Sequence, residues 1–243
     1  MIETKNLVKR FGSKTAVNQL NLHIEPGEFY CFLGPNGAGK TTTIKLLTGL
    51  LKPTSGAAII GGHNIQENPV AAKQLLGYIP DTPFLYEKLT GREFMRFMAG
   101  LYQTPEEVAS NRSEELLDLF EIRDVADQLI EDFSHGMRQK LSFASCFLHD
   151  PKIVVVDEPW VGLDPKNIRF VKDFLREKTS DGVTIFMSTH SLSVIEEAAD
   201  RIGIIHNGTL LHTGSLSDIK ALSRNPGSLE DVFLELTNAE AAP

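Results

Sequence analysis

The fold is decided by one stretch of sequence, Gly34-Pro35-Asn36-Gly37-Ala38-Gly39-Lys40-Thr41, which fits the pattern G-x-x-x-x-G-K-[ST]. Glycines let the backbone curl so that successive N–H groups point inward, at the oxygens of a phosphate. The apolar run Glu28–Leu33 predicts a buried strand before the stretch. Ile44, Leu47 and Leu51 recur at helical spacing after it, and the start of a helix adds partial positive charge. A chance glycine-rich turn would need neither neighbour, so we expect a phosphate-binding loop for a nucleotide.

A second motif further along the chain is Ile153-Val154-Val155-Val156-Asp157-Glu158, an apolar run that ends in two carboxylates. In loops of the first kind the lysine reaches the β- and γ-phosphates and the hydroxyl binds Mg²⁺, which assigns these roles to Lys40 and Thr41. We expect Asp157 to hold the same ion, through water, and Glu158 to polarise the attacking water as a general base. An Asp-Glu pair after a strand is more often part of a solvated loop, but its combination with the lysine loop favours the functional interpretation.

The overall composition limits the possible function classes. With 243 residues, 42% of them hydrophobic and 23% charged, the chain has ordinary globular composition. Its formal net charge of −8 disfavours a surface that coats nucleic acid, so we expect no nucleic-acid partner. No apolar run approaches the roughly 18 residues that cross a bilayer, and the amino end lacks the apolar segment of a secretory signal. Cys31 and Cys146 form neither a disulfide framework nor a metal cluster. These features predict a soluble protein of a reducing, cytosolic compartment.

Apolar runs alternate with helical patterns along the chain. The runs Lys152–Val156 and Val183–Met187 indicate further buried strands. Continuous apolar strands are typical of sheets whose two faces are covered by helices. The alternation therefore predicts an α/β fold with a mainly parallel sheet.

The middle of the chain, residues 85–149, is predicted to be almost entirely helical, with one apolar helix face at Phe94, Phe97 and Leu101. Near the end, Ser228–Leu236 fits a capped amphipathic helix that docks on its own domain. An all-helical insertion in an α/β chain indicates a subdomain. We divide the single domain into an α/β core with its β subdomain, residues 1–84 and 150–220, a helical subdomain, residues 85–149, and a carboxyl-terminal helix and tail, residues 221–243.

Three further motifs stand in a fixed order around the two phosphate motifs. Phe133-Ser134-His135-Gly136-Met137 occupies the place of the Leu-Ser-Gly-Gly-Gln signature of ATP-binding-cassette (ABC) ATPases, and its serine stands 23 residues before Asp157. Gly162-Leu163-Asp164-Pro165 is similar to the D-loop of that family, and His190 to its switch histidine. The chain resembles ABC ATPases from residue 2 to about residue 215.

The resemblance implies a fold and a set of ligands. The fold is a phosphate-loop NTPase with a mainly parallel sheet, an antiparallel β subdomain at the amino end and an inserted helical subdomain. The ligands are ATP and Mg²⁺, and in the family the signature serine and glycine approach the γ-phosphate of ATP held by a second chain. The implied role of His190 is a hydrogen bond to the γ-phosphate and the attacking water. The expected nucleotide contacts are Phe11, against adenine, then Gly34, Pro35, Asn36, Gly37, Ala38, Gly39, Lys40, Thr41 and Thr42, and from the second chain Ser134, Gly136 and Asp164.

Several of these residues have structural alternatives. Phe11 and His190 could each be ordinary core residues. Asp164 could form a turn before Pro165 or cap a helix, and both roles could hold together with a place at the dimer seam. Ser134 could be an ordinary N-cap, although a capped helix start with a free hydroxyl is also an anion site.

The sequence also departs from the commonest form of the family. His135 and Met137 alter the signature in a way that resembles bacterial export ATPases. In Gly77-Tyr78-Ile79-Pro80-Asp81, Asp81 stands where the family's Q-loop usually has a glutamine that senses Mg²⁺ and the membrane partner. The aspartate either binds the cation through water or helps the following segment to turn. Trp160, the only tryptophan, is expected to pack near the site.

Taken with the resemblance, the motifs predict the nucleotide-binding subunit of an ABC transporter of the bacterial exporter kind, with ATPase activity. Two chains, expected to be identical, would close around two Mg·ATP and reopen on hydrolysis. An integral-membrane permease subunit would dock around Phe84–Tyr102, at the cytoplasmic face of the membrane. The alternatives are an ABC ATPase without a transport role, such as a cytosolic assembly or translation factor, and a phosphate-loop kinase or binding-only switch.

Overall fold

Two sheets build the part of the chain that the computed structural model describes, which is residues 1–160, 163–190, 192–222 and 229–239. The first sheet is antiparallel, in the order β2-β1-β4-β5, and comprises β1 (Ile2–Phe11), β2 (Lys14–Ile24), β4 (Ser55–Ile60) and β5 (His63–Asn64). The second is parallel except at β10, in the order β10-β9-β3-β8-β7-β6, and comprises β3 (Phe29–Leu33), β6 (Leu76–Ile79), β7 (Ile153–Asp157), β8 (Thr184–Thr189), β9 (Arg201–His206) and β10 (Thr209–Gly214). The predicted fold, with a mainly parallel sheet and an amino-terminal antiparallel one, is confirmed.

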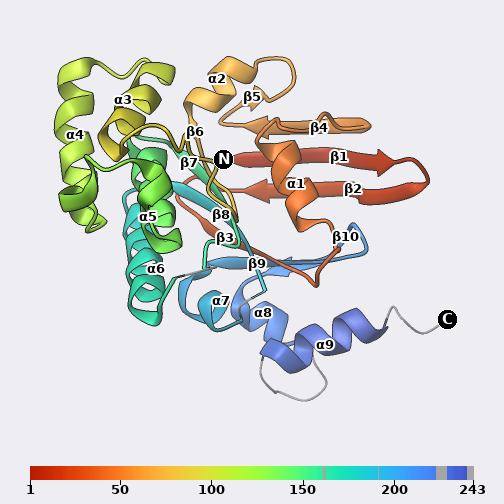
Figure 1. Cartoon of the computed structure of the whole chain (residues 1–243). Coiled ribbons are helices and arrows are strands. Elements are labelled where there is room, and N and C mark those ends of the chain that lie inside the picture. Colours follow the sequence, from red (N-terminus) through yellow and green to blue (C-terminus); the bar gives the residue numbers. More distant parts are fainter. Residues whose placement is uncertain (161–162, 191, 223–228, 240–243) are drawn as a thin grey trace.

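The helices surround the second sheet and form one end of the molecule. Figure 1 shows α3, α4, α5 and α6 stacked on the side away from the first sheet, with α7, α8 and α9 below β9. Residues 85–149 hold three helices and two 3-10 turns, with a single isolated bridge between Thr90 and Leu129. The helices are α1 (Lys40–Leu47), α2 (Pro69–Gln74), α3 (Gly91–Leu101), α4 (Glu106–Leu119), α5 (His135–Phe147), α6 (Pro165–Ser180), α7 (Leu192–Ala198), α8 (Leu216–Lys220) and α9 (Leu229–Ala239), and the 3-10 turns are η1 (Arg123–Val125) and η2 (Ile130–Asp132).

The three strands predicted around the motifs are present and buried. Every residue of β3, β7 and β8 is buried, as expected for strands with helices over both faces of the sheet. β3 pairs in parallel with β8 and β9, and β7 pairs in parallel with β6 and β8. Because these strands run in one direction, their carboxyl ends meet at one edge of the sheet, where open α/β sheets place their ligands.

The helix after the phosphate loop is shorter than the sequence pattern suggests. We expected Leu51 to extend the apolar stripe of Ile44 and Leu47, but α1 ends at Leu47. Thr48 is the C-cap, and Gly49 then adopts a φ of +71°, a left-handed conformation that helices use to stop. Leu51 is therefore outside the helix, where it packs against the apolar cluster beneath the first sheet.

The apolar face predicted for α3 is only partly buried. Phe94 is buried as expected, but Phe97 is 38% exposed and Leu101 is 61% exposed. The side that packs on the core instead carries Met95 and Ala99 next to Phe94. The apolar face of the helix is broad, and periodicity alone does not say which part of it the rest of the chain covers.

The carboxyl-terminal helix packs on its own domain, as predicted. Leu229 and Val232 of α9 are buried, and Phe233 and Leu236 pack against the same apolar cluster as the helical subdomain. The predicted cap at Ser228 and the last residues of the tail lie outside the described residues. Of the helices in the described part of the chain, none combines the length and the apolar character that a membrane span requires.

A titratable pair joins the end of α3 to the turn after α5. The rings of Tyr102 and His149 stack with their centroids 3.5 Å apart and their planes 11° apart. Burial, more than the nearby charge of Arg112, lowers the pKa of His149 to about 4. The unfolded chain, in which the pKa is about 6.5, therefore binds more protons between these two pH values. The stabilising effect of the neutral ring is complete above about pH 6.5 and is lost as the pH falls toward 4.

We predict that lowering the pH from about 7.5 to about 5 reduces the free energy of unfolding by about 1 to 2 kcal/mol more in the wild type than in His149→Phe. Phenylalanine keeps the stack on Tyr102 but cannot take up a proton. Urea titrations followed by circular dichroism at the two pH values measure this difference. An equal pH dependence in the two proteins would show that His149 is not the group responsible.

Candidate nucleotide-binding site

The loop between β3 and α1 is wedged against other parts of the backbone, and this requires its glycines. Gly39 has a φ of +111°, and a Cβ there would lie 2.4 Å from the carbonyl oxygen of Ala16. A Cβ on Gly34 would lie 2.5 Å from the carbonyl oxygen of Ile205 on β9. The N–H of Gly208, in the β9–β10 turn, donates to the carbonyl oxygen of Ala38 at 2.8 Å. The loop is thus held from behind by both sheets, and its other side faces a pocket.

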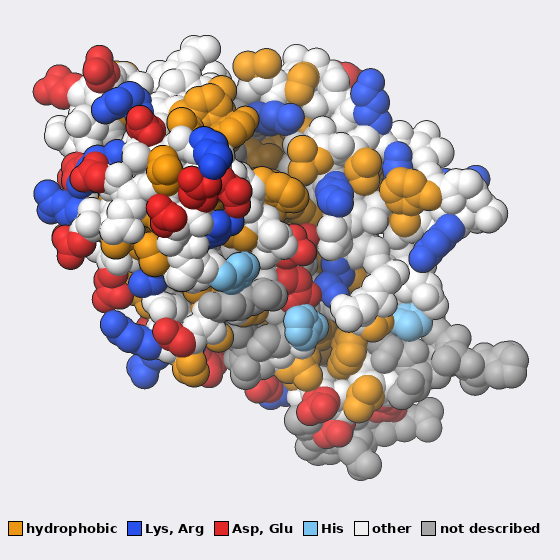
Figure 2. Space-filling view, viewed as in Figure 1, with side chains coloured by type: hydrophobic (Ala, Val, Ile, Leu, Met, Phe, Trp, Pro, Cys, Tyr) orange, Lys and Arg blue, Asp and Glu red, His pale blue; other side chains and the backbone are white. Residues whose placement is uncertain are grey.

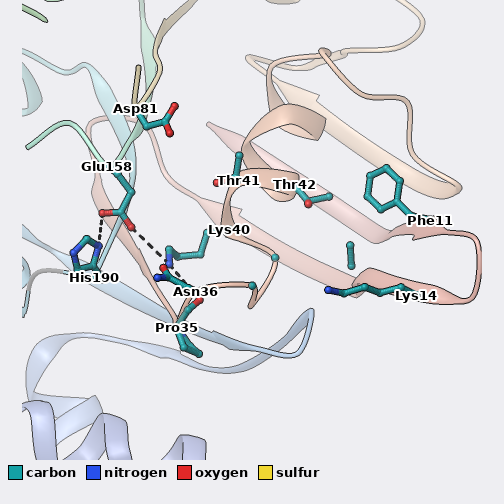
Figure 3. Close-up of a pocket in the computed structure, with 13 residues that line it drawn as sticks. Phe11, Lys14, Pro35, Asn36, Lys40, Thr41, Thr42, Asp81, Glu158 and His190 are labelled. Carbon is teal, nitrogen blue, oxygen red and sulfur yellow. Dashed lines mark hydrogen bonds and ion pairs between the residues drawn. The ribbon is translucent and has the colours of Figure 1, made fainter. Parts of the chain in front are cut away.

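This pocket has a volume of about 550 Å³ and lies at the carboxyl edge of the second sheet. Figure 2 shows the hollow between the helical end of the molecule and the first sheet, with lysine or arginine and acidic side chains on its walls. Phe11 lies across the pocket from Glu158 (Figure 3). The residues that line it are Phe11, Lys14, Ala16, Pro35, Asn36, Gly37, Gly39, Lys40, Thr41, Thr42, Asp81, Glu158 and His190.

Two lining residues, Lys14 and Ala16, are absent from the sequence-based prediction. Lys14 pairs with Phe11 across the β1–β2 hairpin. The signal that could have found it is Gly12, which has a φ of +56° and begins the tight turn between the two strands. Phe11 was expected at the site, so recognition of this turn would have predicted that Lys14, its partner in the hairpin, lies there too.

The ammonium group of Lys40 is buried inside the loop. Its Nζ donates to the carbonyl oxygen of Gly34 at 2.6 Å and to that of Pro35 at 3.3 Å, and lies 3.6 Å from Oε1 of Glu158. Only 6% of the residue is exposed. A buried cation is costly unless it is paired, and this one has a single carboxylate within 4 Å among the described residues. The surroundings of Lys40 therefore favour an additional anion in the pocket.

Glu158 stands at the centre of the site in a strained conformation. Its φ is +46°, in the left-handed region that residues other than glycine seldom adopt. The N–H of Glu158 donates to the carbonyl oxygen of Ser188 at 3.2 Å, which ties the segment after β7 to β8. Its Oε2 lies 2.6 Å from Nδ1 of His190, so that the carboxylate points between His190 and Lys40 (Figure 3).

The oxygen atoms next to Glu158 are suited to a hard cation. Asp157 is buried, and its Oδ1 accepts a hydrogen bond from Oγ of Ser188 at 2.5 Å. Burial raises the pKa of Asp157, hydrogen bonds from Ser188 and Thr41 oppose the rise, and the charges of Asp81 and Glu158 add to it. A cation would relieve this crowding of negative charge. Since no group of three or more His, Cys, Asp or Glu residues in the described chain could hold a metal alone, such an ion would need further oxygens from a ligand, as Mg²⁺ takes from phosphates.

Asp81 takes one of the two roles that the sequence left open, and its binding of a cation stays a prediction. It lines the pocket, and its Oδ1 also accepts a hydrogen bond from the N–H of Thr82 at 2.8 Å. The turn is therefore present, and the side chain remains on the wall of the pocket (Figure 3).

Other predicted residues lie away from the pocket of their own chain. Ser134 caps α5 by accepting from the N–H of Met137 at 3.2 Å, and Asp164 caps α6 by accepting from the N–H of Asn167 at 2.8 Å. Neither of them, nor Gly136, is among the described residues that line the pocket. The pocket lining also lacks three other predicted residues, Gly34, Ala38 and Asp157. Gly162 of the expected D-loop lies outside the described residues.

Comparison with known proteins places this site in a family. The sequence profile of the ABC transporter family matches residues 17–161. The bacitracin transport ATP-binding protein BcrA of Enterococcus faecalis is 38% identical over 225 residues, which cover 92% of this chain and 72% of that protein. The ABC-type transporter ATP-binding protein EcsA of Bacillus subtilis is 32% identical over 99% of this chain and 98% of its own length.

Solved structures agree. The structure of an ATP-binding subunit of an ABC transporter superimposes with a TM-score of 0.92 at 34% identity, covering 98% of this chain and 99% of that one. The dimeric structure of the bacterial ABC transporter cassette MJ0796 gives a TM-score of 0.82 at 26% identity, covering 89% and 99%. With a family profile, relatives and a fold that match at this level, the chain belongs to the ABC transporter family and is one of its ATP-binding, ATP-hydrolysing cassettes.

Proposed function

We propose that this cassette uses ATP hydrolysis to drive solute export through a separate integral-membrane permease subunit, at the cytoplasmic face of the membrane. The observation that carries the proposal is the carboxylate of Glu158, held between Lys40 and His190 in the pocket. Transport in the export direction is supported by relatives that are named for bacitracin transport and for linearmycin resistance.

In the proposed reaction the triphosphate of ATP lies along the loop, with adenine against Phe11. Lys40, which now donates to loop carbonyls, binds the β- and γ-phosphates. Glu158 accepts a proton from water as the water oxygen bonds to the γ-phosphorus, and the bond to the bridging oxygen of ADP breaks. His190 keeps the carboxylate in place through its Nδ1 and hydrogen-bonds the phosphate. The products are ADP and inorganic phosphate.

Mg²⁺ is the metal that the site fits. Thr41 and Asp157 would hold it, with Asp81 acting through water, because these residues offer hydroxyl and carboxylate oxygens beside the loop. When bound, the ion neutralises charge on the β- and γ-phosphate oxygens. Burial raises the pKa of Asp157, which disfavours its ionised form, and a cation bound beside it would favour that form again.

A second copy of the chain completes the site in this proposal. Ser134, Gly136 and Asp164 lie at helix starts outside their own pocket, and a helix start attracts anions. The proposed assembly is a head-to-tail homodimer in which each Ser134 faces the γ-phosphate bound by the other copy. The similarity to the dimeric MJ0796 cassette supports this arrangement. ATP favours the closed dimer because only the closed state contacts both sides of the γ-phosphate, and hydrolysis removes that preference.

The permease is proposed to dock on the aromatic patch, which we define as Phe84, Tyr86, Phe97 and Leu101. All four side chains are exposed, and the rings of Tyr86 and Phe97 meet edge to face with their centroids 5.1 Å apart. Figure 2 shows hydrophobic side chains gathered on this face between α3 and the first sheet. Exposed apolar patches of this kind mark protein contacts. The patch begins three residues after Asp81, so contact there could move a residue of the pocket wall.

We predict that Glu158→Gln lowers kcat for ATP hydrolysis by about 100-fold or more while ATP still binds, because the amide cannot accept the proton of the attacking water. Phosphate release and ATP affinity, measured on the same preparation, test this. Glu177→Gln, an exposed change on α6, is the control and should keep wild-type turnover. Turnover of Glu158→Gln within twofold of the wild type would remove Glu158 from its role as the general base.

Lys40→Ala should raise the Kd for ATP by about tenfold or more, since charge-assisted hydrogen bonds to the phosphates are lost. Lys45→Ala, on the exposed side of the same helix, should bind as the wild type does. Calorimetric titration with ATP measures both. Equal affinities in the two variants would mean that the loop does not hold the phosphates.

The double variant Phe84→Ser/Phe97→Ser should lose an integral-membrane protein that co-purifies with the wild type from detergent-solubilised membranes. Its ATPase activity without the membrane should stay within about twofold, because neither side chain lines the pocket. Val108→Ser, an exposed apolar residue on α4, is the control and should keep the partner. If the wild type instead co-purifies with ribosomes or an assembly scaffold and no membrane protein, the chain is an ABC ATPase without a transport role.

A further inference from the structure

Gln139 is a buried polar residue that the reaction described above does not use. It lies on α5, five residues after the cap Ser134, and its side chain has no exposed surface. Its Nε2 donates to the carbonyl oxygen of Pro159 at 3.3 Å, while its Oε1 is buried without a partner in the described chain. Burying an unpaired carbonyl is unfavourable. An apolar side chain of similar size would fill the same space without that cost, so packing alone does not account for the amide.

The carbonyl that Gln139 holds belongs to the residue after Glu158. Because Glu158 has a φ of +46°, its backbone needs restraint from its surroundings to stay in that conformation. On the amino side the restraint is the hydrogen bond from the N–H of Glu158 to Ser188. On the carboxyl side Pro159 has no N–H to donate, so its carbonyl oxygen is the polar group by which the segment is fixed.

The segment after Glu158 has few other polar attachments. Trp160 packs against the main apolar cluster, and its Nε1 is buried with no partner among the residues described. The backbone carbonyl oxygen of Trp160 accepts a hydrogen bond from the N–H of Leu163, three residues further along the chain. Within the described chain, the bond from Gln139 is therefore the hydrogen bond that joins this segment to α5.

We propose that Gln139 is a positioning residue for Glu158, which sets the carboxylate by holding the carbonyl of Pro159 against α5. The inference rests on the proposed function, in which Glu158 activates water and the start of α5 contacts nucleotide. Gln139 lies on α5, the helix that Ser134 caps. A movement of this helix when Ser134 contacts nucleotide would therefore shift Pro159, and with it Glu158, through the Gln139 side chain. Without the bond, the strained backbone relaxes and the carboxylate leaves its place between Lys40 and His190, although the phosphate loop that binds ATP is unchanged.

The test is Gln139→Met, which keeps the length and the unbranched shape of the side chain but removes both polar atoms. We expect kcat to fall by about tenfold or more, the Kd for ATP to stay within twofold, and the melting temperature to stay level, because the unpaired carbonyl of Gln139 is removed while that of Pro159 loses its donor. If Gln139 had only a structural role, the Gln139→Met variant would lose stability and activity together. Gln139→Leu provides a second apolar replacement if the first variant does not fold.

The matched control is Ser145→Ala, which removes a buried polar group from the same helix. Ser145 Oγ donates to the carbonyl oxygen of Ser142, within α5, and makes no contact with the segment after Glu158 in the described structure. It should keep wild-type kcat. A kcat of Gln139→Met within twofold of the wild type, or a loss equal to that of Ser145→Ala, overturns the inference.

Glu158→Gln, measured in the same assay, separates this inference from the proposed function. If Glu158→Gln loses turnover and Gln139→Met keeps it, the positioning role fails and the function stands. If Glu158→Gln keeps turnover, the function fails, and the positioning role fails with it because there is no catalytic carboxylate to position.

Discussion

The parallel pairing of β3, β8 and β7 is the constraint on which the rest of the structure depends. β8 lies between the strand that leads into the phosphate loop and the strand that leads into Asp157 and Glu158. Because all three run in one direction, their last residues reach the same edge of the sheet. His190, directly after β8, is thereby placed 2.6 Å from Glu158. Residues distant in the sequence form one site because three apolar strands are aligned.

The charges at this edge are arranged for a ligand that is both anionic and bound to a metal. Lys40 is buried and donates to loop carbonyls. Asp157 is also buried, and burial raises its pKa. Lys40 is therefore stabilised by a nearby anion, and the ionised form of Asp157 by a nearby cation. A phosphate group satisfies the first, and a divalent cation satisfies the second. Lys40 follows β3 and Asp157 ends β7, the two strands on either side of β8, so in the proposed function Mg·ATP meets both demands together.

The sequence predicted the motifs more reliably than their surroundings. The loop, the carboxylates and the three buried strands could be predicted because each depends on local composition and spacing. The exposure of Phe97 and Leu101 could not be predicted, because helical periodicity does not identify which part of an apolar face is covered. Lys14 was missed because its place depends on strand pairing in a hairpin. The left-handed backbone of Glu158 and the burial of Gln139 depend on contacts between segments far apart in the chain, and no local pattern carries them.

In the proposed function, ATP bound in the pocket of one copy joins that copy to the helix start at Ser134 of a second copy. The most direct measurement is the mass of the Glu158→Gln variant in solution, by light scattering, with and without saturating Mg·ATP. We expect the single-chain mass of 26.9 kDa without nucleotide and about twice that mass with it. A variant that binds Mg·ATP yet keeps the single-chain mass at micromolar concentration and across salt conditions would contradict it.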